Sequence, residues 1–228
     1  KFISDSHDNL NKGTLYVANL EAGTWSPLDK DIHLELGKYF TSQLELLIQT
    51  RAAAKIAKAT PLDRPEDIEI HPISKDVFIT LTNNKPKGNY HGSILKLMEE
   101  NADAGSLTFK HEYFLTGGEE SGFSCPDNLA FDDKNNLWFT SDIAAGSQKK
   151  KQYEPFKNNG LFMVPVSGKN AGKVLQIASA PNAAEFTGPF FSPDYKTLFL
   201  SVQHPGETSK DKDNFVSHWP NGNNSKPI

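Results

Sequence analysis

Short runs in which hydrophobic and polar residues alternate dominate this chain, and three long phrases repeat the same pattern. The phrases begin at Arg64, Cys125 and Glu185 and read RPEDIEIHPISKDVFITLTNN, CPDNLAFDDKNNLWFTSD and EFTGPFFSPDYKTLFLSVQHPGE. Each has an acidic opening turn, a short alternating strand, a polar turn and an aromatic-rich return strand. Pro65 and Pro126 are 61 positions apart, a period that suits one four-stranded antiparallel unit with long connections. The repeat therefore predicts an all-β fold made of β-propeller blades.

The segments around the three phrases divide the chain into partial and complete blades. We expect outer strands of one blade in residues 1–37, a helical insertion in 38–60, blades in 61–123 and 124–184, the start of a further blade in 185–205, and a polar tail in 206–228. The insertion is predicted from apolar residues at three- and four-residue spacing between Phe40 and Ile56, and from the run RAAAKIAKA. Pro61 would end it, so we expect one inserted helix on the propeller surface.

These parts amount to about three blades, whereas propellers typically close with four to eight. We therefore expect the chain to be a fragment of a larger ring.

Composition narrows the function classes. The chain has 228 residues, of which 37% are hydrophobic, enough for a substantial core. The net charge of -4 and the lack of a basic patch argue against a nucleic-acid partner. No apolar run approaches the ~20 residues that a membrane span needs. Because there is a single cysteine, no internal disulfide can form.

Several common catalytic motifs are absent from the sequence. There is no G-x-S-x-G, no P-loop and no H-E-x-x-H, and the seven histidines are scattered without ligand spacing. What remains is a set of carboxylates at the opening turns of the phrases: Glu66, Asp127 and Glu185. Because blades are arranged radially, equivalent turns point at one central axis. We therefore expect these three side chains to converge from different blades.

Carboxylates that converge either take up protons or bind a cation, and oxygen ligands favour hard ions such as calcium. The alternative is that acidic residues at such turns only cap backbone amides. Arg64 offers a planar fork that matches phosphate or carboxylate, or it forms a salt bridge with its acidic neighbours. Cys125 could bind a soft metal as a thiolate, but a lone cysteine at a strand start is more often a small buried hydrophobe.

The phrases ATPLDRPEDIEIHPISKDVFITLTNN, GFSCPDNLAFDDKNNLWFTSD and EFTGPFFSPDYKTLFLSVQHPGE, followed by HWPNG, closely resemble the carboxy-terminal half of the PhoX-type bacterial alkaline phosphatases. The resemblance runs from GTLYVANL near the start to WPNG. It implies a six-bladed propeller, periplasmic or secreted, in which an axial cluster of calcium and iron hydrolyses phosphate monoesters. It also implies a partner, the missing amino-terminal half of the same propeller.

By this resemblance Glu66, Asp127 and Glu185 are expected to be metal ligands, and Arg64 is expected to grip the phosphate. Asn128 is a weaker candidate ligand. The family's iron-binding thiolate lies in an amino-terminal stretch that nothing here matches, and Cys125 is not its replacement. We therefore expect the fragment alone to be inactive.

Two alternatives stay open. The phrase PDNLAFDDKNNLWFTSD is also similar to calcium-dependent lactonases of the gluconolactonase or paraoxonase type, whose metal could be bound here by Glu66, Asn128 and Asp142. The third class is a non-catalytic propeller that serves as a binding platform.

Overall fold

The computed structural model describes residues 1–6, 10–211, 214–222 and 225–227. The predicted polar tail 206–228 therefore falls partly outside the described residues. The described residues divide into two compact units. Unit 1 comprises Lys1–Pro61 and Leu97–His111, and unit 2 comprises Leu62–Lys96 and Glu112–Ile228.

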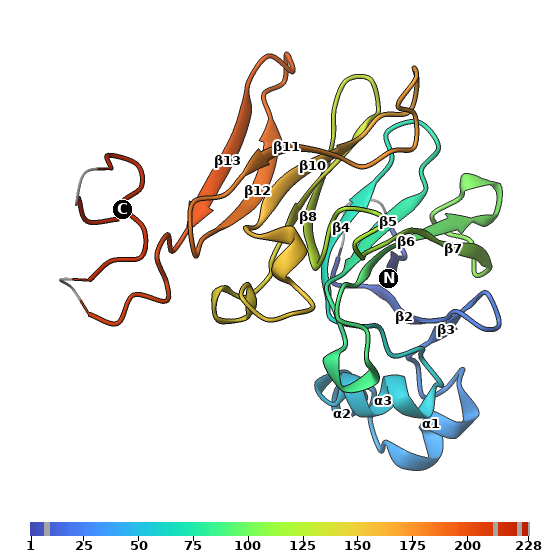
Figure 1. Ribbon diagram of the computed structural model, residues 1–228. Helices are drawn as coiled ribbons and strands as arrows, with labels where there is room; N and C mark the ends of the chain where they lie inside the picture. The colour runs from blue at the N-terminus through green and yellow to red at the C-terminus, as the bar shows by residue number, and fades with distance from the viewer. Residues whose placement is uncertain (7–9, 212–213, 223–224, 228) are drawn as a thin grey trace. The chain divides into compact units, whose positions relative to one another are not determined.

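In the described part of the chain the strands form four sheets (Figure 1). The first has the order β1-β2-β3, with β1 Phe2–Ser4, β2 Gly13–Asn19 and β3 Thr24–Pro27. The second has the order β4-β5-β6-β7, with β4 Pro65–Ile70, β5 Val77–Leu81, β6 Ser93–Glu99 and β7 Phe109–Thr116. The third has the order β11-β10-β9-β8, with β8 Pro126–Phe131, β9 Leu137–Ser141, β10 Gly160–Val164 and β11 Leu175–Ser179. The fourth is the hairpin of β12 Glu185–Phe191 and β13 Leu198–Gln203.

The two phrases that open four-stranded sheets fold alike. β4 pairs antiparallel with β5, and β8 pairs antiparallel with β9. The first strands of the second, third and fourth sheets lie side by side, since β4 contacts β8 and β8 contacts β12. This all-β arrangement of successive antiparallel sheets confirms the predicted fold class.

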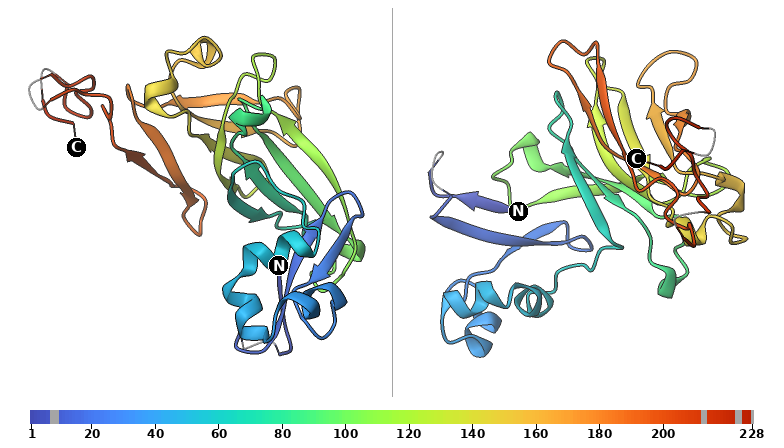
Figure 2. Two further views of the ribbon diagram at one scale, coloured as in Figure 1. Left: turned by 90° about the horizontal axis from the view of Figure 1, so that it is seen from below. Right: turned by 90° about the vertical axis from the view of Figure 1, so that its left-hand side faces the viewer.

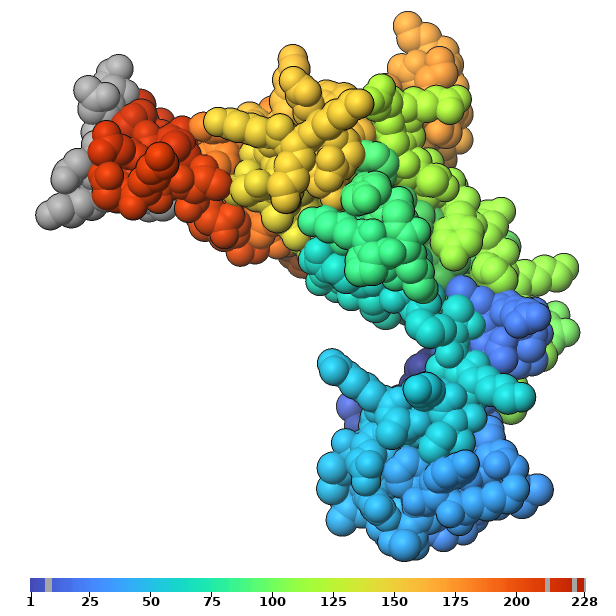
Figure 3. Space-filling model, turned by 60° about the horizontal axis from the view of Figure 1, so that its bottom comes forward, coloured from blue at the N-terminus to red at the C-terminus, as the bar shows by residue number. Residues whose placement is uncertain are grey.

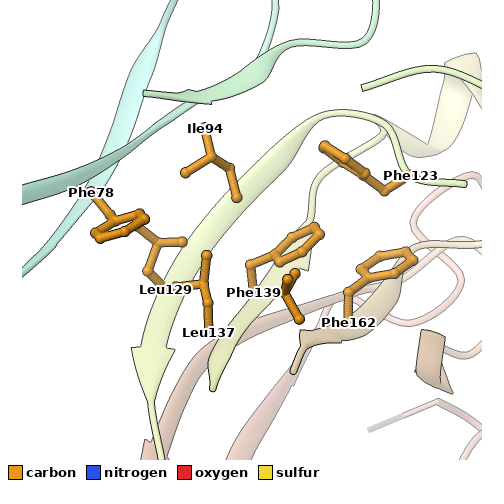
Figure 4. Packing of buried hydrophobic residues seen from close by; sticks show 8 residues of the cluster. Phe78, Ile94, Phe123, Leu129, Leu137, Phe139 and Phe162 are labelled. Atoms are coloured by element: carbon orange, nitrogen blue, oxygen red, sulfur yellow. The ribbon is translucent and has the colours of Figure 1, made fainter. Parts of the chain in front are cut away.

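The core between the second and third sheets is aromatic. It contains eight buried side chains: Phe78, Ile94, Phe123, Leu129, Leu137, Phe139, Phe162 and Val164 (Figure 4). Phe139 and Phe162 are stacked, with ring centroids 5.0 Å apart and an interplanar angle of 16°. Phe123 meets Phe139 edge-on at 5.0 Å. Alternation explains the members of this set that lie in strands, because every second residue of a strand faces the same side of its sheet. Phe123 lies in the connection before β8.

The helical insertion is three short helices instead of the one predicted, and the first begins at Leu34, within the range 1–37 that was expected to hold outer strands. They are α1 Leu34–Tyr39, α2 Gln43–Ile48 and α3 Thr50–Ile56. The chain leaves the helical conformation at Phe40 and starts again at Ser42, whose hydroxyl caps α2 by accepting a hydrogen bond from the Glu45 amide at 3.1 Å. The 3₁₀ turns η1 Lys85–Lys87, η2 Glu100–Ala102, η3 Ala145–Ser147 and η4 Glu154–Phe156 complete the elements.

The breaks change which apolar side chains are buried. The helices pack as one compact body (Figure 3) around a cluster of Leu28, Leu36, Phe40, Leu46, Ala53 and Ala57. Leu44 and Ile48, which a single continuous stripe would bury, are 70% and 75% exposed.

The β12–β13 hairpin presents an exposed aromatic face. It lies at the end of the series of sheets in unit 2 (Figures 1 and 2). Phe199 is the second residue of β13, as Phe78 is of β5. Phe78 is 4% exposed beneath the next sheet, but Phe199 is 58% exposed and pairs with the equally uncovered Phe190. The hairpin therefore exposes aromatic side chains at positions that are buried in a sheet covered by its neighbour.

Candidate active site at the acidic turns

Two opening turns have the same backbone design. Arg64 and Cys125 each adopt a positive φ of 54° directly before a proline. The Arg64 carbonyl accepts a hydrogen bond from the Thr82 amide at 3.0 Å, and the Cys125 carbonyl accepts one from the Asp142 amide at 2.8 Å. The strand register then shifts after Pro65 and after Pro126. Such a shift re-aims the residues beside it, and it places Glu66 and Asp127 at equivalent positions.

Glu185 reaches the same region from a different position. It pairs with Gln203, and the register of β12 shifts only after Thr187. Glu185 therefore lies before the shift, whereas Glu66 and Asp127 lie within theirs, because pairing resumes only at Ile68 and Leu129. The expectation that all three occupy matching turn positions is wrong for Glu185, because β12 begins pairing earlier than β4 and β8 do.

The carboxylates nevertheless share one electrostatic environment. Burial raises the pKa of Asp127 to about 6, with further contributions from the charges of Asp142, Glu66 and Asp67. Burial also raises the pKa of Glu185 to about 8, followed by a hydrogen bond and the charge of Asp142 and then the charge of Asp127. We call Glu66, Asp127, Asp142 and Glu185 the acidic cluster.

Arg64 is the cation of this cluster. Its guanidinium nitrogen lies 2.9 Å from Glu66 Oε1 and 3.6 Å from Asp142 Oδ2. Its charge lowers the pKa of Asp127, in opposition to the carboxylates. The guanidinium is half exposed, so its remaining N–H groups can bind an anion from solvent.

Asp142 is the residue whose importance the sequence did not reveal. It appeared only as a ligand in the lactonase alternative, yet it interacts with both Arg64 and Glu185. It follows the last residue of β9, Ser141, instead of opening a strand. The sequence does show that an acidic residue directly follows β9, the return strand of the second phrase. This position could have predicted its place beside the Asp127 turn, because antiparallel pairing brings the end of β9 next to the start of β8.

The QHPGE phrase also reaches the cluster. His204 Nε2 lies 3.3 Å from Glu185 Oε1, and His204 Nδ1 lies 3.7 Å from Glu207 Oε2. A cavity of ≈ 250 Å³ is lined by Asp142, Asn159, Glu185, His204 and Glu207, among others. The phrase therefore supplies polar groups beside Glu185.

The acidic cluster has the ligand chemistry of a hard-cation site but not its geometry. The acidic cluster offers carboxylate oxygens alone, which suit calcium. Among the described residues, however, no group of three or more His, Cys, Asp or Glu side chains is arranged to hold a metal ion. The acidic cluster therefore has oxygens of the chemistry that calcium prefers, but these described side chains are not arranged to hold a metal ion by themselves.

Cys125 does not fit a soft metal. Its side chain is buried against Ile143 and Tyr153, and burial raises the pKa of its thiol. The Asn83 amide nitrogen lies 3.6 Å from its sulfur. These surroundings are those of a small buried hydrophobe with weak polar contacts.

The side-chain oxygen of Asn128 already has hydrogen-bond partners. Its Oδ1 accepts hydrogen bonds from Thr187 Oγ1 at 2.6 Å and from the Gly188 amide at 2.8 Å. This weighs against Asn128 as a ligand and removes one member of the lactonase set.

The raised pKa values predict how stability depends on pH when metal is removed. The unfolded chain loses the protons of Asp127 and Glu185 near their ordinary pKa values of 3.8 and 4.5, whereas the folded chain retains them to about 6 and 8. The folded state thus binds more protons across this window, so the free energy of unfolding should fall as the pH rises from about 4 to about 8. Urea denaturation in the presence of chelator measures this slope. Asp142→Asn should flatten it, and a slope equal in the variant and the wild type would contradict the assignment.

No helix in the described part of the chain is long and apolar enough to cross a membrane.

The chain matches a known protein family and a solved structure. The family model "Alkaline phosphatase PhoX" matches residues 3–206. The structure of Pseudomonas fluorescens PhoX in complex with vanadate, a transition state analogue, is similar with a TM-score of 0.85 and 29% sequence identity. The match covers 99% of this chain and 46% of that chain, so this chain spans less than half the length of the protein it matches. Comparison with the curated proteins gave no match.

Proposed function

This chain belongs to the PhoX alkaline phosphatase family, and on that premise we propose that it supplies part of an active site that hydrolyses phosphate monoesters. The observation that carries the proposal is the meeting of Arg64 with the acidic cluster at one end of successive sheets. Vanadate bound to the Pseudomonas fluorescens protein as a transition state analogue supports a phosphoryl substrate. We infer a periplasmic or secreted location from the same family resemblance.

We propose Glu66, Asp127 and Glu185 as metal ligands, with Asp142 beside them. Burial, followed by the charges of neighbouring carboxylates, raises the pKa values of Asp127 and Glu185. Bound calcium would offset the repulsion among these carboxylates and would supply positive charge for the phosphoryl oxygens. Iron is expected to bind through a thiolate outside this chain, because buried Cys125 does not fit that role.

Arg64 is proposed to bind the substrate. Glu66 and Asp142 hold its guanidinium at the opening turn, which limits the side-chain entropy lost on binding. Two parallel N–H donors can then contact two phosphoryl oxygens, and these contacts strengthen as charge develops in the transition state.

The remaining part of the propeller is proposed as the partner of this chain. The uncovered aromatic face of β12–β13 is a suitable surface for it, because Phe199 is exposed where Phe78 of a covered sheet is buried. The described residues of the acidic cluster are not arranged to hold a metal ion by themselves. Together with the uncovered face, this leads us to expect that the chain alone is inactive.

A graft tests the proposal. The chain replaces the matching portion of Pseudomonas fluorescens PhoX, and hydrolysis of p-nitrophenyl phosphate is compared between the graft and the chain alone. We expect turnover by the graft and none by the chain. Turnover by the chain alone near that of the intact Pseudomonas fluorescens protein would refute the expected inactivity. An inactive, folded graft that binds no vanadate would refute the phosphatase assignment, and would leave a non-catalytic platform as the alternative.

A further inference from the structure

Two side chains connect successive sheets at positions directly after the acidic residues. Asp67 follows Glu66, and its Oδ2 accepts a hydrogen bond from the Leu129 amide of β8 at 2.8 Å. Asn128 follows Asp127, and its Oδ1 accepts the two hydrogen bonds from Thr187 and Gly188 of β12 described above. Each bond spans about sixty positions of sequence and ends on the first strand of the next sheet.

The same two residues are also fixed within their own sheets. The Asp67 amide donates to Thr80 Oγ1 at 2.9 Å, and the Asn128 amide donates to Thr140 Oγ1 at 3.1 Å. Both threonines are fully buried. The hydroxyls satisfy amides that the register shifts remove from the strand ladder. Residues 67 and 128 are therefore held on both sides, by a buried hydroxyl in their own sheet and by donors on the first strand of the next sheet.

The far end of each connection lies close to the next acidic residue. Leu129 is two positions after Asp127, and Thr187 is two positions after Glu185. A hydrogen bond from Asp67 thus connects the Glu66 turn to the Asp127 turn, and a hydrogen bond from Asn128 connects the Asp127 turn to the start of β12.

We propose that Asp67 and Asn128 are positioning residues that set the separation between successive acidic side chains. The inference rests on the proposed function for the role of those side chains as ligands. It assigns Asn128 a task other than ligation and explains why an oxygen acceptor follows the acidic residue in both sheets. A ligand set drawn from separate sheets needs such a connection, because small displacements between sheets change every oxygen-to-oxygen distance.

The test uses calcium alone, measured by titration calorimetry on the chelator-treated chain. Asn128→Leu, which removes the acceptor, should weaken calcium binding about 10- to 100-fold, the range for residues that orient metal ligands. Asn128→Asp keeps an acceptor, as Asp67 does in the preceding sheet, and should restore most of the affinity. Asn170→Leu, in the connection between β10 and β11 at the opposite end of that sheet, is the matched control and should leave the affinity unchanged.

Amide hydrogen exchange separates the positioning role from general stability. In Asn128→Leu the Gly188 amide should exchange at least about tenfold faster, while amides of the β8–β9 ladder keep their rates. Faster exchange at Gly188 with unchanged calcium affinity would overturn the proposal.

A wild-type chain that binds no calcium would count against the proposed metal site and not against the connection itself. Crystal structures then decide, through the separation of Asp127 and Glu185 in the wild type and in Asn128→Leu. A larger separation in the variant supports the positioning role, and an unchanged separation overturns it.

Discussion

Replacing Phe139 with alanine is expected to lower the free energy of unfolding by about 3–5 kcal/mol. The side chain is 0% exposed and lies at the centre of the core between the second and third sheets (Figure 4). It stacks on Phe162 and meets Phe123 edge-on, so its removal loses apolar burial and two ring contacts and leaves a cavity. Urea denaturation followed by tryptophan fluorescence measures the loss, since Trp138 adjoins Phe139 in β9.

The matched control is Phe199→Ala on the β12–β13 hairpin. Phe199 is 58% exposed, so the same substitution should change the free energy of unfolding of the chain by less than about 0.5 kcal/mol. In the graft with the remaining PhoX sequence the same change should cost more, because the face would then be covered. Equal losses for Phe139→Ala and Phe199→Ala in the isolated chain would contradict this description of the core.

The repeated phrases were sufficient to predict the pairs β4–β5, β8–β9 and β12–β13 because their information is local. Alternation selects strands, and Pro65 and Pro126 mark where the first strands begin. The acidic turns of Glu66 and Asp127 were predictable for the same reason, since each follows a proline directly. No proline stands directly before Glu185, which follows Ala184, and the pairing of β12 with β13 sets its position instead.

Asp142 and the helical insertion show what local patterns leave undetermined. The local pairing of β9 with β8 brings Asp142 next to the Asp127 turn. Its contacts with Arg64 and Glu185 join residues of three sheets, and its neighbours in sequence do not encode them. In the insertion, alanine-rich composition favoured one continuous helix, but the cap at Ser42 and the non-helical backbone of Gln49 (φ -96°, ψ 37°) divide it. Capping is readable from sequence, whereas the face that tertiary packing buries is not.

Replacing Arg64 with methionine in the graft is expected to lower kcat/KM for p-nitrophenyl phosphate by about 10²- to 10³-fold, the range for removal of one donor that stabilises transition-state charge. Arg64→Lys should recover only part of this, because an ammonium cannot provide two parallel N–H donors. The chain offers a close control, since Arg51 is its other arginine and is exposed on α3. Arg51→Met should leave kcat/KM unchanged.

A second effect of Arg64 must be separated from substrate binding, because its charge also lowers the pKa of Asp127. If Arg64 acted only through the acidic cluster, Arg64→Met would weaken calcium binding and shift the pH profile, and saturating calcium would restore the activity. If Arg64 binds the phosphoryl group, vanadate inhibition should weaken together with kcat/KM in Arg64→Met at saturating calcium. Arg64→Lys should weaken both to a smaller extent. Unchanged vanadate inhibition in Arg64→Met would therefore exclude the guanidinium as a phosphate-binding group, and would leave its contacts with Glu66 and Asp142 as its role.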